Sequence, residues 1–310
     1  MPKIHVSRSE IIQASPEKVF NAVSDFATWT TWSPWLCAEP DANVDVSDDS
    51  NSVGSTYDWD GEIVGAGGMQ HTLLNPGSRI KCDLSFLRPF KSTAKVAFDF
   101  KPEGDGTKIS WSMDSSLPFF LFWMKNGMES MIGMDYERGL KLLKEWLETG
   151  EILSKTKIRG VEEIGPIHMV GVRKICSMDD IGASMETAFN EGVELANAKQ
   201  LNTCGERMAV YHCVDLKNQT FDYTAGFVVP DVVDGANGLS TWSIPRPSKA
   251  VAVEHTGSYE NLGNPWSAAY SYVRYKKLKQ SNDGTFEVYK NDPQETSPAD
   301  LKTEIFLPLR

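Results

Sequence analysis

The residues best suited to chemistry lie near the end of the 310-residue chain, in the run Phe286-Glu287-Val288-Tyr289. Strand alternation predicts that Glu287 and Tyr289 share one face, with Phe286 and Val288 on the other. Unpaired burial of a carboxylate is costly, so a carboxylate among apolar and aromatic side chains is normally paired, protonated or available to a cation. The alternative is a half-exposed strand on which Glu287 faces solvent, and the pattern alone leaves both open.

An earlier stretch of the chain matches the last sixty or so residues. Val170-Gly171-Val172 aligns with Val251-Ala252-Val253, and Met208-Ala209-Val210-Tyr211 aligns with the run from Phe286 to Tyr289. A strand-helix-strand-strand unit therefore recurs at a period of about 80 residues, which is too long for a solenoid repeat and indicates a duplicated half-domain.

The two halves differ in the residues that could bind a ligand. The first half has Met178, Met185, Phe189 and Ala209 where the second has Tyr259, Trp266, Tyr270 and Glu287. The second half thus carries hydroxyls, an indole and a carboxylate at positions that are apolar in the first. This asymmetry predicts a binding cleft on one side of a pseudo-twofold axis.

Several motifs of this part resemble the GyrI-like small-molecule-binding domain, which also serves as the effector-binding module of AraC- and MerR-type regulators. They are the run from His255 to Tyr259, Asn264-Pro265-Trp266, the run from Phe286 to Pro293, and the run from Thr303 to Pro308. The resemblance covers the chain from near Lys157 to its end. It implies two half-repeats, at about 157–230 and 248–310, around an aromatic cleft whose acidic residue meets cationic, lipophilic ligands.

The resemblance assigns the acidic position to Glu287 and the tyrosine of the H-x-G-x-Y run to Tyr259. We expect the remaining ligand-binding residues to be Trp266, Tyr270 and Tyr289. Trp242 lies in the connection from Asp231 to Ser248, which otherwise has the composition of a surface loop. It is the candidate for a lid over the cleft.

The first 151 residues predict a separate domain of helix-grip fold. A strand from Lys3 is followed by a short helix with Ser15 as N-cap and Pro16 in its first turn, then by short strands, and by a helix over about 128–147 with one wide apolar face. These features and the run from Trp29 to Trp35 resemble the START-like superfamily, the SRPBCC or polyketide cyclase group. That resemblance implies a cavity for lipophilic molecules between sheet and helix.

The expected cavity residues are Trp32, Trp35, Trp111 and Tyr136. The alternative is that the tryptophans of this region simply fill the core. Together the patterns predict an α+β protein with two domains, a START-like domain over residues 1–151 and a GyrI-like domain of duplicated β-α-β-β units over residues 152–310.

Composition narrows the possible functions. A net charge of −11 without a basic stripe or helix-turn-helix segment argues against nucleic acid as a partner. The five scattered cysteines show no disulfide framework and no C-x-x-C metal spacing, and neither a signal peptide nor a membrane span is recognised. We therefore expect a cytoplasmic protein without metal or cofactor.

The leading hypothesis is a small-molecule-binding protein for lipophilic, possibly cationic, ligands. One alternative is a hydrolase of strained electrophilic molecules, in which Glu287 acts as general base and Tyr259 as acid or orienting donor. That version needs a second acid in the cleft, for which Asp222 and Glu304 are the candidates. The other alternative is a regulatory or sequestering protein that acts on a partner.

Overall fold

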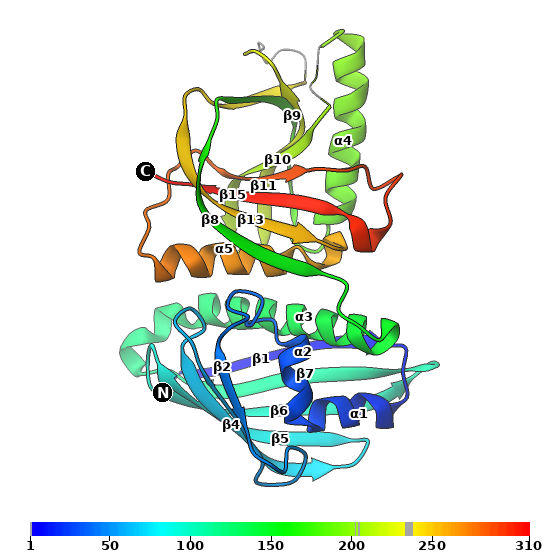
Figure 1. The fold of residues 1–310 in the computed structure, drawn as a ribbon, viewed down its shortest axis with the longest axis vertical. Helices are drawn as coiled ribbons and strands as arrows, with labels where there is room; N and C mark the ends of the chain where they lie inside the picture. The colour runs from blue at the N-terminus through cyan, green and yellow to red at the C-terminus, as the bar shows by residue number, and fades with distance from the viewer. Residues whose placement is uncertain (1, 202, 204, 233–237) are drawn as a thin grey trace. The chain divides into compact units, whose positions relative to one another are not determined.

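The chain folds into two compact units, Met1–Lys155 and Thr156–Arg310, each with its own core (Figure 1). The computed structural model describes residues 2–201, 203, 205–232 and 238–310. Cys204 and residues 233–237, which belong to the predicted connection from Asp231 to Ser248, lie outside the described residues. The sequence patterns placed the change of domain between residues 151 and 152, and the structure divides the chain after Lys155.

The N-terminal unit consists of a seven-stranded antiparallel sheet in the order β1-β7-β6-β5-β4-β3-β2, with one long helix. Its strands are β1 Lys3–Ile12, β2 Asn43–Val46, β3 Thr56–Asp60, β4 Ala66–Asn75, β5 Arg79–Arg88, β6 Ser92–Glu103 and β7 Gly106–Ser116. Its helices are α1 Pro16–Ser24, η1 Phe26–Thr28, α2 Trp29–Trp32, η2 Phe119–Met124 and α3 Lys125–Thr149.

Local signals explain where two of these helices lie. The side chain of Ser15 accepts a hydrogen bond from the backbone N–H of Lys18, and Pro16 opens α1. The inward residues of α3, among them Tyr136, Leu140, Leu143 and Leu147, recur at helical spacing and are buried. They join the apolar faces of β1, β5, β6 and β7 in a single core.

The C-terminal unit is built on an eight-stranded sheet in the order β12-β9-β11-β10-β14-β15-β13-β8. Its strands are β8 Lys155–Ile164, β9 Ile167–Ser177, β10 Arg207–Asp215, β11 Thr220–Val229, β12 Ser240–Ile244, β13 Ser248–Thr256, β14 Thr285–Tyr289 and β15 Lys302–Pro308. Its helices are α4 Ile181–Ala198, η3 Tyr259–Asn261, α5 Gly263–Tyr275 and η4 Pro298–Asp300.

The duplication is visible in the order of the strands. The sequence β9-α4-β10-β11 is repeated as β13-α5-β14-β15, and these two halves of the C-terminal unit meet where β10 pairs antiparallel with β14. The strands that precede the two halves are exchanged. β8 pairs beside β13 of the second half, whereas β12 pairs with β9 of the first half.

The sheet of the C-terminal unit has apolar side chains on both faces. Helix α4 packs on β9 and β11, and helix α5 packs on β13 and β15, so one face is covered by helices. We call it the helix face. On the opposite face, here called the reverse face, Met208, Val210, Phe286, Val288 and Phe306 form a second apolar cluster.

The predicted fold class is confirmed. Antiparallel sheets and helices make up both units, the N-terminal sheet is followed by the long helix, and the C-terminal unit consists of two related halves. Two features were not predicted, the strands β8 and β12 that lie at the edges of the C-terminal sheet. Neither has a strong apolar signal, since charged residues are frequent in β8 and hydroxylated residues in β12, although the burial of β12 alternates.

Candidate functional site

Glu287 lies in the middle of the C-terminal sheet, at the place where the two halves meet. It faces Ala209 across the β10–β14 ladder and Ile305 across the β14–β15 ladder, so its side chain is on the helix face. Only 1% of the residue is exposed. The strand has the alternation that the sequence predicted, and of the two possibilities for Glu287, burial among aromatic residues is the one observed.

Three aromatic side chains donate hydrogen bonds to this carboxylate. The hydroxyl of Tyr289 donates to Oε2 over 2.5 Å, and the indole Nε1–H of Trp266 in helix α5 donates to Oε1. The hydroxyl of Tyr211 in β10 is the third donor. A carboxylate offers about four acceptor positions, so three donors leave one of them for a further group.

Burial dominates the ionisation of this cluster. Loss of water raises the pKa of Glu287, and the hydrogen bonds from Tyr289, Trp266 and Tyr211 act in the opposite direction without cancelling the rise. The pKa values of Tyr211 and Tyr289 are raised well above the usual range, first by burial and then by the neighbouring Glu287 charge. The tyrosines therefore stay protonated and act as donors.

Aromatic rings surround the carboxylate on several sides. The ring of Tyr211 meets that of Trp266 edge-on at 5.4 Å between centroids, and Tyr259 and Phe189 meet Tyr289 at 5.5 and 5.6 Å. Tyr259 and Trp266 are half-buried. The site thus combines the buried carboxylate of Glu287 with aromatic rings that remain partly accessible to solvent.

Short turns determine where Tyr259 lies. Gly257 has a φ of 128°, a conformation that favours glycine, and it ends strand β13 directly before the turn. The side chain of Ser258 then accepts from the N–H of Glu260 and starts the 3-10 turn that begins at Tyr259. Burial, followed by the Glu287 charge, raises the pKa of Tyr259 to about 12.

The predicted neighbours of Glu287 lie at different distances from it. Trp266 and Tyr289 contact the carboxylate directly, and Tyr259 reaches it through the ring of Tyr289. Tyr270 stacks on Trp266 at 6.1 Å between centroids and is 43% exposed, which places it at the outer side of the cluster.

Tyr211 was not among the predicted site residues. The duplication contained the signal that could have found it, because Tyr211 aligns with Tyr289 and the two halves meet around a pseudo-twofold axis. Ala209 and Glu287 are equivalent in the repeat and face each other directly in the ladder, so the axis passes between them. Two equivalent tyrosines therefore converge on a single carboxylate.

Trp242 does not cover the cleft. It lies in strand β12, its indole donates to the backbone carbonyl of Asp283, and its ring packs on Phe286 at 5.3 Å between centroids. Phe286 points to the reverse face, away from Glu287. The expected lid is replaced by a strand because β12 pairs along β9 and holds the side chain on that face.

The two candidates for a second acid also lie on the reverse face. Tyr223 bonds to Ser184 of helix α4 on the helix face, so its neighbour Asp222 points the other way and forms a bidentate pair with Arg173, at 2.8 and 2.7 Å. This pairing lowers the pKa of Asp222. The expectation that Asp222 could complete the cleft is therefore corrected.

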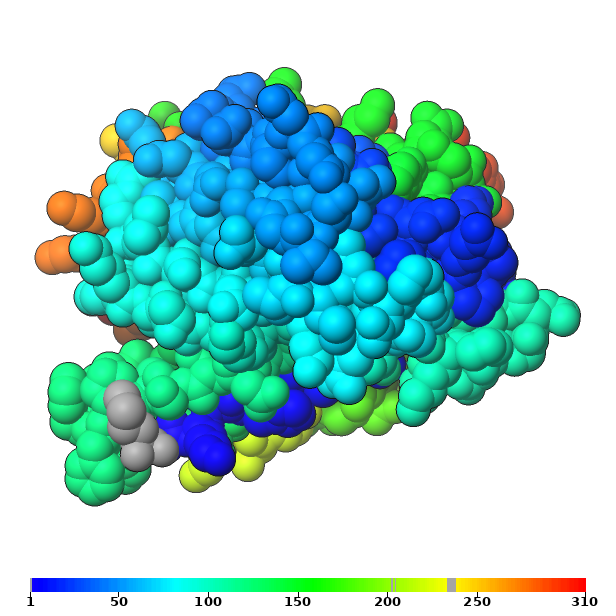
Figure 2. Space-filling view, turned by 90° about the horizontal axis from the view of Figure 1, so that it is seen from below, coloured from blue at the N-terminus to red at the C-terminus, as the bar shows by residue number. Residues whose placement is uncertain are grey.

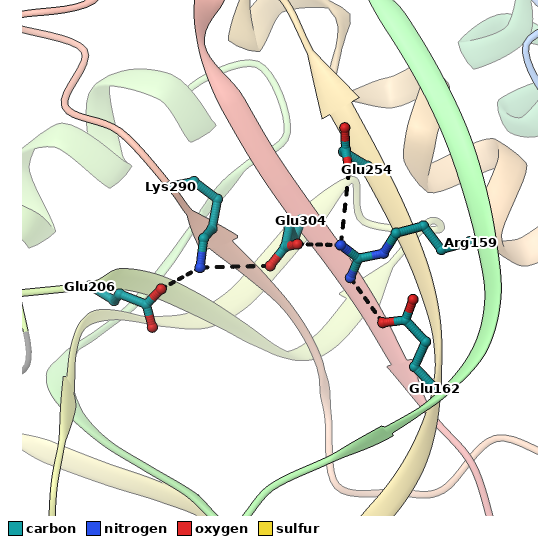
Figure 3. Close-up of polar contacts among 6 residues, drawn as sticks. All are labelled: Arg159, Glu162, Glu206, Glu254, Lys290 and Glu304. Carbon is teal, nitrogen blue, oxygen red and sulfur yellow. Dashed lines mark hydrogen bonds and ion pairs between the residues drawn. The ribbon is translucent and has the colours of Figure 1, made fainter.

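Glu304 belongs to a network of charges that Figure 3 shows. Arg159 of β8 contacts Glu304, Glu162 and Glu254, and Lys290 bridges Glu304 to Glu206 (Figure 3). Glu304 faces Val288 across the ladder, and Val288 is part of the reverse-face cluster. Glu304 therefore lies on the reverse face and is paired with cations, as Asp222 is. The expectation that Glu304 could be the second acid beside Glu287 is corrected for that reason.

In the N-terminal unit the predicted cavity residues contact one another. Trp111 stacks on Tyr136 at 4.0 Å between centroids and meets Trp32 edge-on at 5.9 Å. All three are at most 3% exposed, and the indole N–H groups of Trp32 and Trp111 have no hydrogen-bond partner among the described residues. Trp35 is 36% exposed and donates to Asp135 over 3.1 Å. That these residues line a cavity stays a prediction.

The described residues contain neither a metal-type cluster nor a helix that could span a membrane. Within residues 2–201, 203, 205–232 and 238–310, no cluster of three or more His, Cys, Asp or Glu side chains has the arrangement of a metal site. In the same part of the chain, no helix has the length and apolar character needed to cross a bilayer.

Family models match both units. Residues 160–310 match the GyrI-like small molecule binding domain, and residues 3–148 match the family described as polyketide cyclase / dehydrase and lipid transport. The chain is thus a polyketide-cyclase-type domain followed by a GyrI-like domain, in the order that the sequence predicted. Both descriptions point to the binding of small molecules. No curated protein matches the chain.

Several solved structures are similar to part of this chain. A protein from Chromobacterium violaceum is 19% identical, covers 47% of this chain and 98% of its own length, and gives a TM-score of 0.37. The Aha1 dimer from Colwellia psychrerythraea is also 19% identical, with 47% and 98% covered and a TM-score of 0.36. A DNA complex of EcmrR is 19% identical, with 59% and 66% covered and a TM-score of 0.41.

Proposed function

We propose that the C-terminal domain binds a lipophilic small molecule that carries a positive charge, and that Glu287 is the group that selects the charge. The match to a small-molecule-binding family supports binding in general. The observation that carries the finer proposal is the position of Glu287. It is a nearly inaccessible carboxylate, held by donors from three aromatic side chains, and within the part of the chain that the structure describes no cation is among the groups that shift its pKa.

Two interactions stabilise a bound cation in such a site. It pairs with a carboxylate that burial has made costly to keep charged, and it stacks against aromatic faces, at about 0.5–2 kcal/mol for each face. Tyr259, Trp266 and Tyr270 offer these faces because none of the three is fully buried. A neutral ligand of the same shape gains only the apolar contact.

The test compares two ligands of equal shape, a naphthyl-trimethylammonium ion and its neutral tert-butyl analogue. Glu287→Gln keeps the shape of the side chain and removes its charge. We expect the variant to bind the cation about tenfold or more weakly, because a buried ion pair is lost, while the affinity for the neutral analogue stays within about twofold. Isothermal titration measures both.

Glu254→Gln is the matched control, since it removes one carboxylate from the reverse face and leaves Glu287 and its donors intact. It should change neither affinity. An equal loss of both ligands in Glu287→Gln, or no loss of either, would show that Glu287 does not select the charge.

The structure gives less support to hydrolysis. Asp222 and Glu304, the candidates for a second acid, are paired with cations on the reverse face. Tyr259 meets the ring of Tyr289, and the donors to Glu287 are Tyr289, Trp266 and Tyr211. We therefore place binding ahead of catalysis. The regulatory role stays a prediction.

The proposed setting is the cytoplasm. The four described cysteines, Cys37, Cys82, Cys176 and Cys213, form no disulfide. Unpaired thiols of this kind are typical of a reducing compartment.

A further inference from the structure

One end of the N-terminal sheet exposes an unusual number of large aromatic side chains. In the 3-10 turn η2, Phe119, Phe120, Phe122 and Trp123 are 77%, 73%, 61% and 70% exposed. Leu87 near the end of β5 and Phe90 in the following turn are 55% and 81% exposed. Single exposed apolar residues are common on protein surfaces, whereas a group of this kind marks an interaction site.

The geometry of η2 determines which of its side chains are buried and which are exposed. A 3-10 helix has three residues per turn, so residues three apart share a face. Leu121 and Met124 form the half-buried face, and Leu121 packs on the core. The pairs Phe119–Phe122 and Phe120–Trp123 form the other two faces, and both are aromatic and exposed. One face holds the turn in place while two present rings to the outside.

The two segments lie at the same end of the sheet. Phe86 pairs with Ser92 where β5 turns into β6, and Ala94 of β6 pairs with Ser115 at the end of β7, directly before η2. In Figure 2 the blue-green stretch that contains η2 forms the lower left corner of this unit, opposite the turn between β6 and β7. We call the six exposed residues, Leu87, Phe90, Phe119, Phe120, Phe122 and Trp123, the aromatic rim.

The rim is flanked by cations in a chain whose net charge is −11. Residues 85–98 and 115–128 contain Arg88, Lys91, Lys95 and Lys125, and they contain no aspartate or glutamate. Arg88, Lys95 and Lys125 also contact carboxylates of neighbouring segments, Asp60, Asp83 and Glu129, in largely exposed pairs. Exposed pairs of this kind are weak and are readily exchanged for another anion.

We propose that the aromatic rim docks the protein on an anionic lipid bilayer surface. Phenylalanine and tryptophan rings insert at the boundary between headgroups and acyl chains, and neighbouring lysine and arginine side chains contact anionic headgroups. The charge also decides against a second copy of this chain as the occupant. A symmetric contact through the rim would bring the cations of one copy against those of the other.

The experiment is flotation of the full-length chain with vesicles of phosphatidylcholine alone and of phosphatidylcholine mixed with phosphatidylglycerol. We expect binding to the mixed vesicles that weakens as salt is added, because screening reduces the electrostatic part. The double variant Phe120→Ser, Trp123→Ser should lower the partition coefficient about tenfold or more, since two exposed rings that would enter the bilayer are lost. Both positions are exposed, so the fold should be kept.

Matched controls separate the rim from general surface effects. The double variant Val53→Ser, Ile175→Ser removes apolar residues that are 63% and 73% exposed outside the rim, and it should bind like the unaltered protein. Lys91→Glu, Lys125→Glu should abolish the preference for the anionic vesicles. Lys81→Glu, Lys101→Glu, which changes the same charge away from the rim, should keep most of it.

Three results would overturn the proposal. The first is no flotation with anionic vesicles at low salt. The second is equal flotation of the rim variant and its apolar control. The third is self-association of the chain in solution that the rim variant abolishes in the absence of vesicles, which would make a second copy the occupant. Analytical ultracentrifugation measures that association.

Discussion

At the scale of single residues, the site is defined by the buried carboxylate of Glu287 and the groups that donate to it. Glu287 is held by Tyr289, Trp266 and Tyr211, all of them neutral donors, and its burial outweighs their help. Structural carboxylates in protein interiors are usually paired with an arginine or lysine, as Glu304 is on the reverse face. Among the described residues no arginine or lysine pairs with Glu287, and this is the reason to look for a cation in a ligand.

The raised pKa of Glu287 predicts how stability depends on pH. A carboxyl group whose pKa is higher in the folded state favours folding when it is protonated. Its favourable contribution is complete below the pKa of the unfolded chain, near 4, and is lost as pH rises through the higher folded value. Ionisation of Glu287 therefore lowers the stability of the unliganded protein.

Relative to the unaltered unliganded protein, Glu287→Gln should gain stability as the pH rises, and the gain should disappear as the pH falls towards 4. Urea unfolding at several pH values measures the difference. Glu260→Gln, at an exposed position, is the control and should show no such trend. A difference in stability that does not grow as the pH rises would contradict the burial argument.

How much of the site was predictable differs from residue to residue. Glu287 and Trp266 were found because they differ from the apolar residues at the equivalent positions of the first repeat. Tyr211 was missed because it looks ordinary in its own strand and matters only through the strand pairing that brings it beside Glu287. Asp222, Glu304 and Trp242 remained candidates because alternation gives two faces and does not say which of them the helices cover.

At the scale of elements, the close pairing of β9 with β11 depends on two glycines. Gly171 and Gly226 face each other in the ladder, and a Cβ atom on Gly226 would lie 2.1 Å from the carbonyl oxygen of Val170 and 2.4 Å from the Cα of Gly171. Backbone atoms on a paired strand have no flexible end to move. The close approach is therefore possible only without side chains.

Gly226→Ala should destabilise the C-terminal domain by about 2–4 kcal/mol, because the two strands must move apart. Gly182→Ala in helix α4 is the control, since its added Cβ would meet nothing within 4 Å, and alanine is the better helix former. Thermal unfolding of both variants tests the pair. Equal stability of the two would mean that the ladder relaxes more easily than its geometry indicates.

The regular elements were largely predictable, and the edge strands were not. A helix that repeats apolar residues over twenty positions, such as α3, carries its signal in its own sequence. β8 and β12 have no such signal. Their position depends on partners far away in the chain, β13 and β9, and a segment of five residues like β12 forms a strand only because β9 is there to pair with it.

At the scale of the whole molecule, the two units have separate cores and should unfold separately. We expect calorimetry of the full chain to show two transitions. The naphthyl-trimethylammonium ion should raise only one of them, that of the C-terminal domain, by an amount that grows with ligand concentration. At a hundredfold excess over the dissociation constant the stabilisation is about 2.7 kcal/mol.

A point variant identifies which transition belongs to which domain. Gly226→Ala should lower the transition that the cation raises and leave the other unchanged. A single cooperative transition, or a shift of both transitions by the ligand, would show that the two domains are coupled in unfolding.

The exchange of β8 and β12 has a consequence for what a symmetric ancestor could have been. Either half alone would lend its first strand to a partner and would need a second copy to receive one back, which is the geometry of a swapped homodimer. In such a dimer, each copy places the same residue at the twofold axis, so that residue is present twice. Two copies of the second half would set Glu287 against Glu287, and two copies of the first would set Ala209 against Ala209. A homodimer can thus place two carboxylates at its centre, or none. Joining the halves in one chain removes that restriction, and it is what allows a single negative charge to occupy the middle of an otherwise twofold frame.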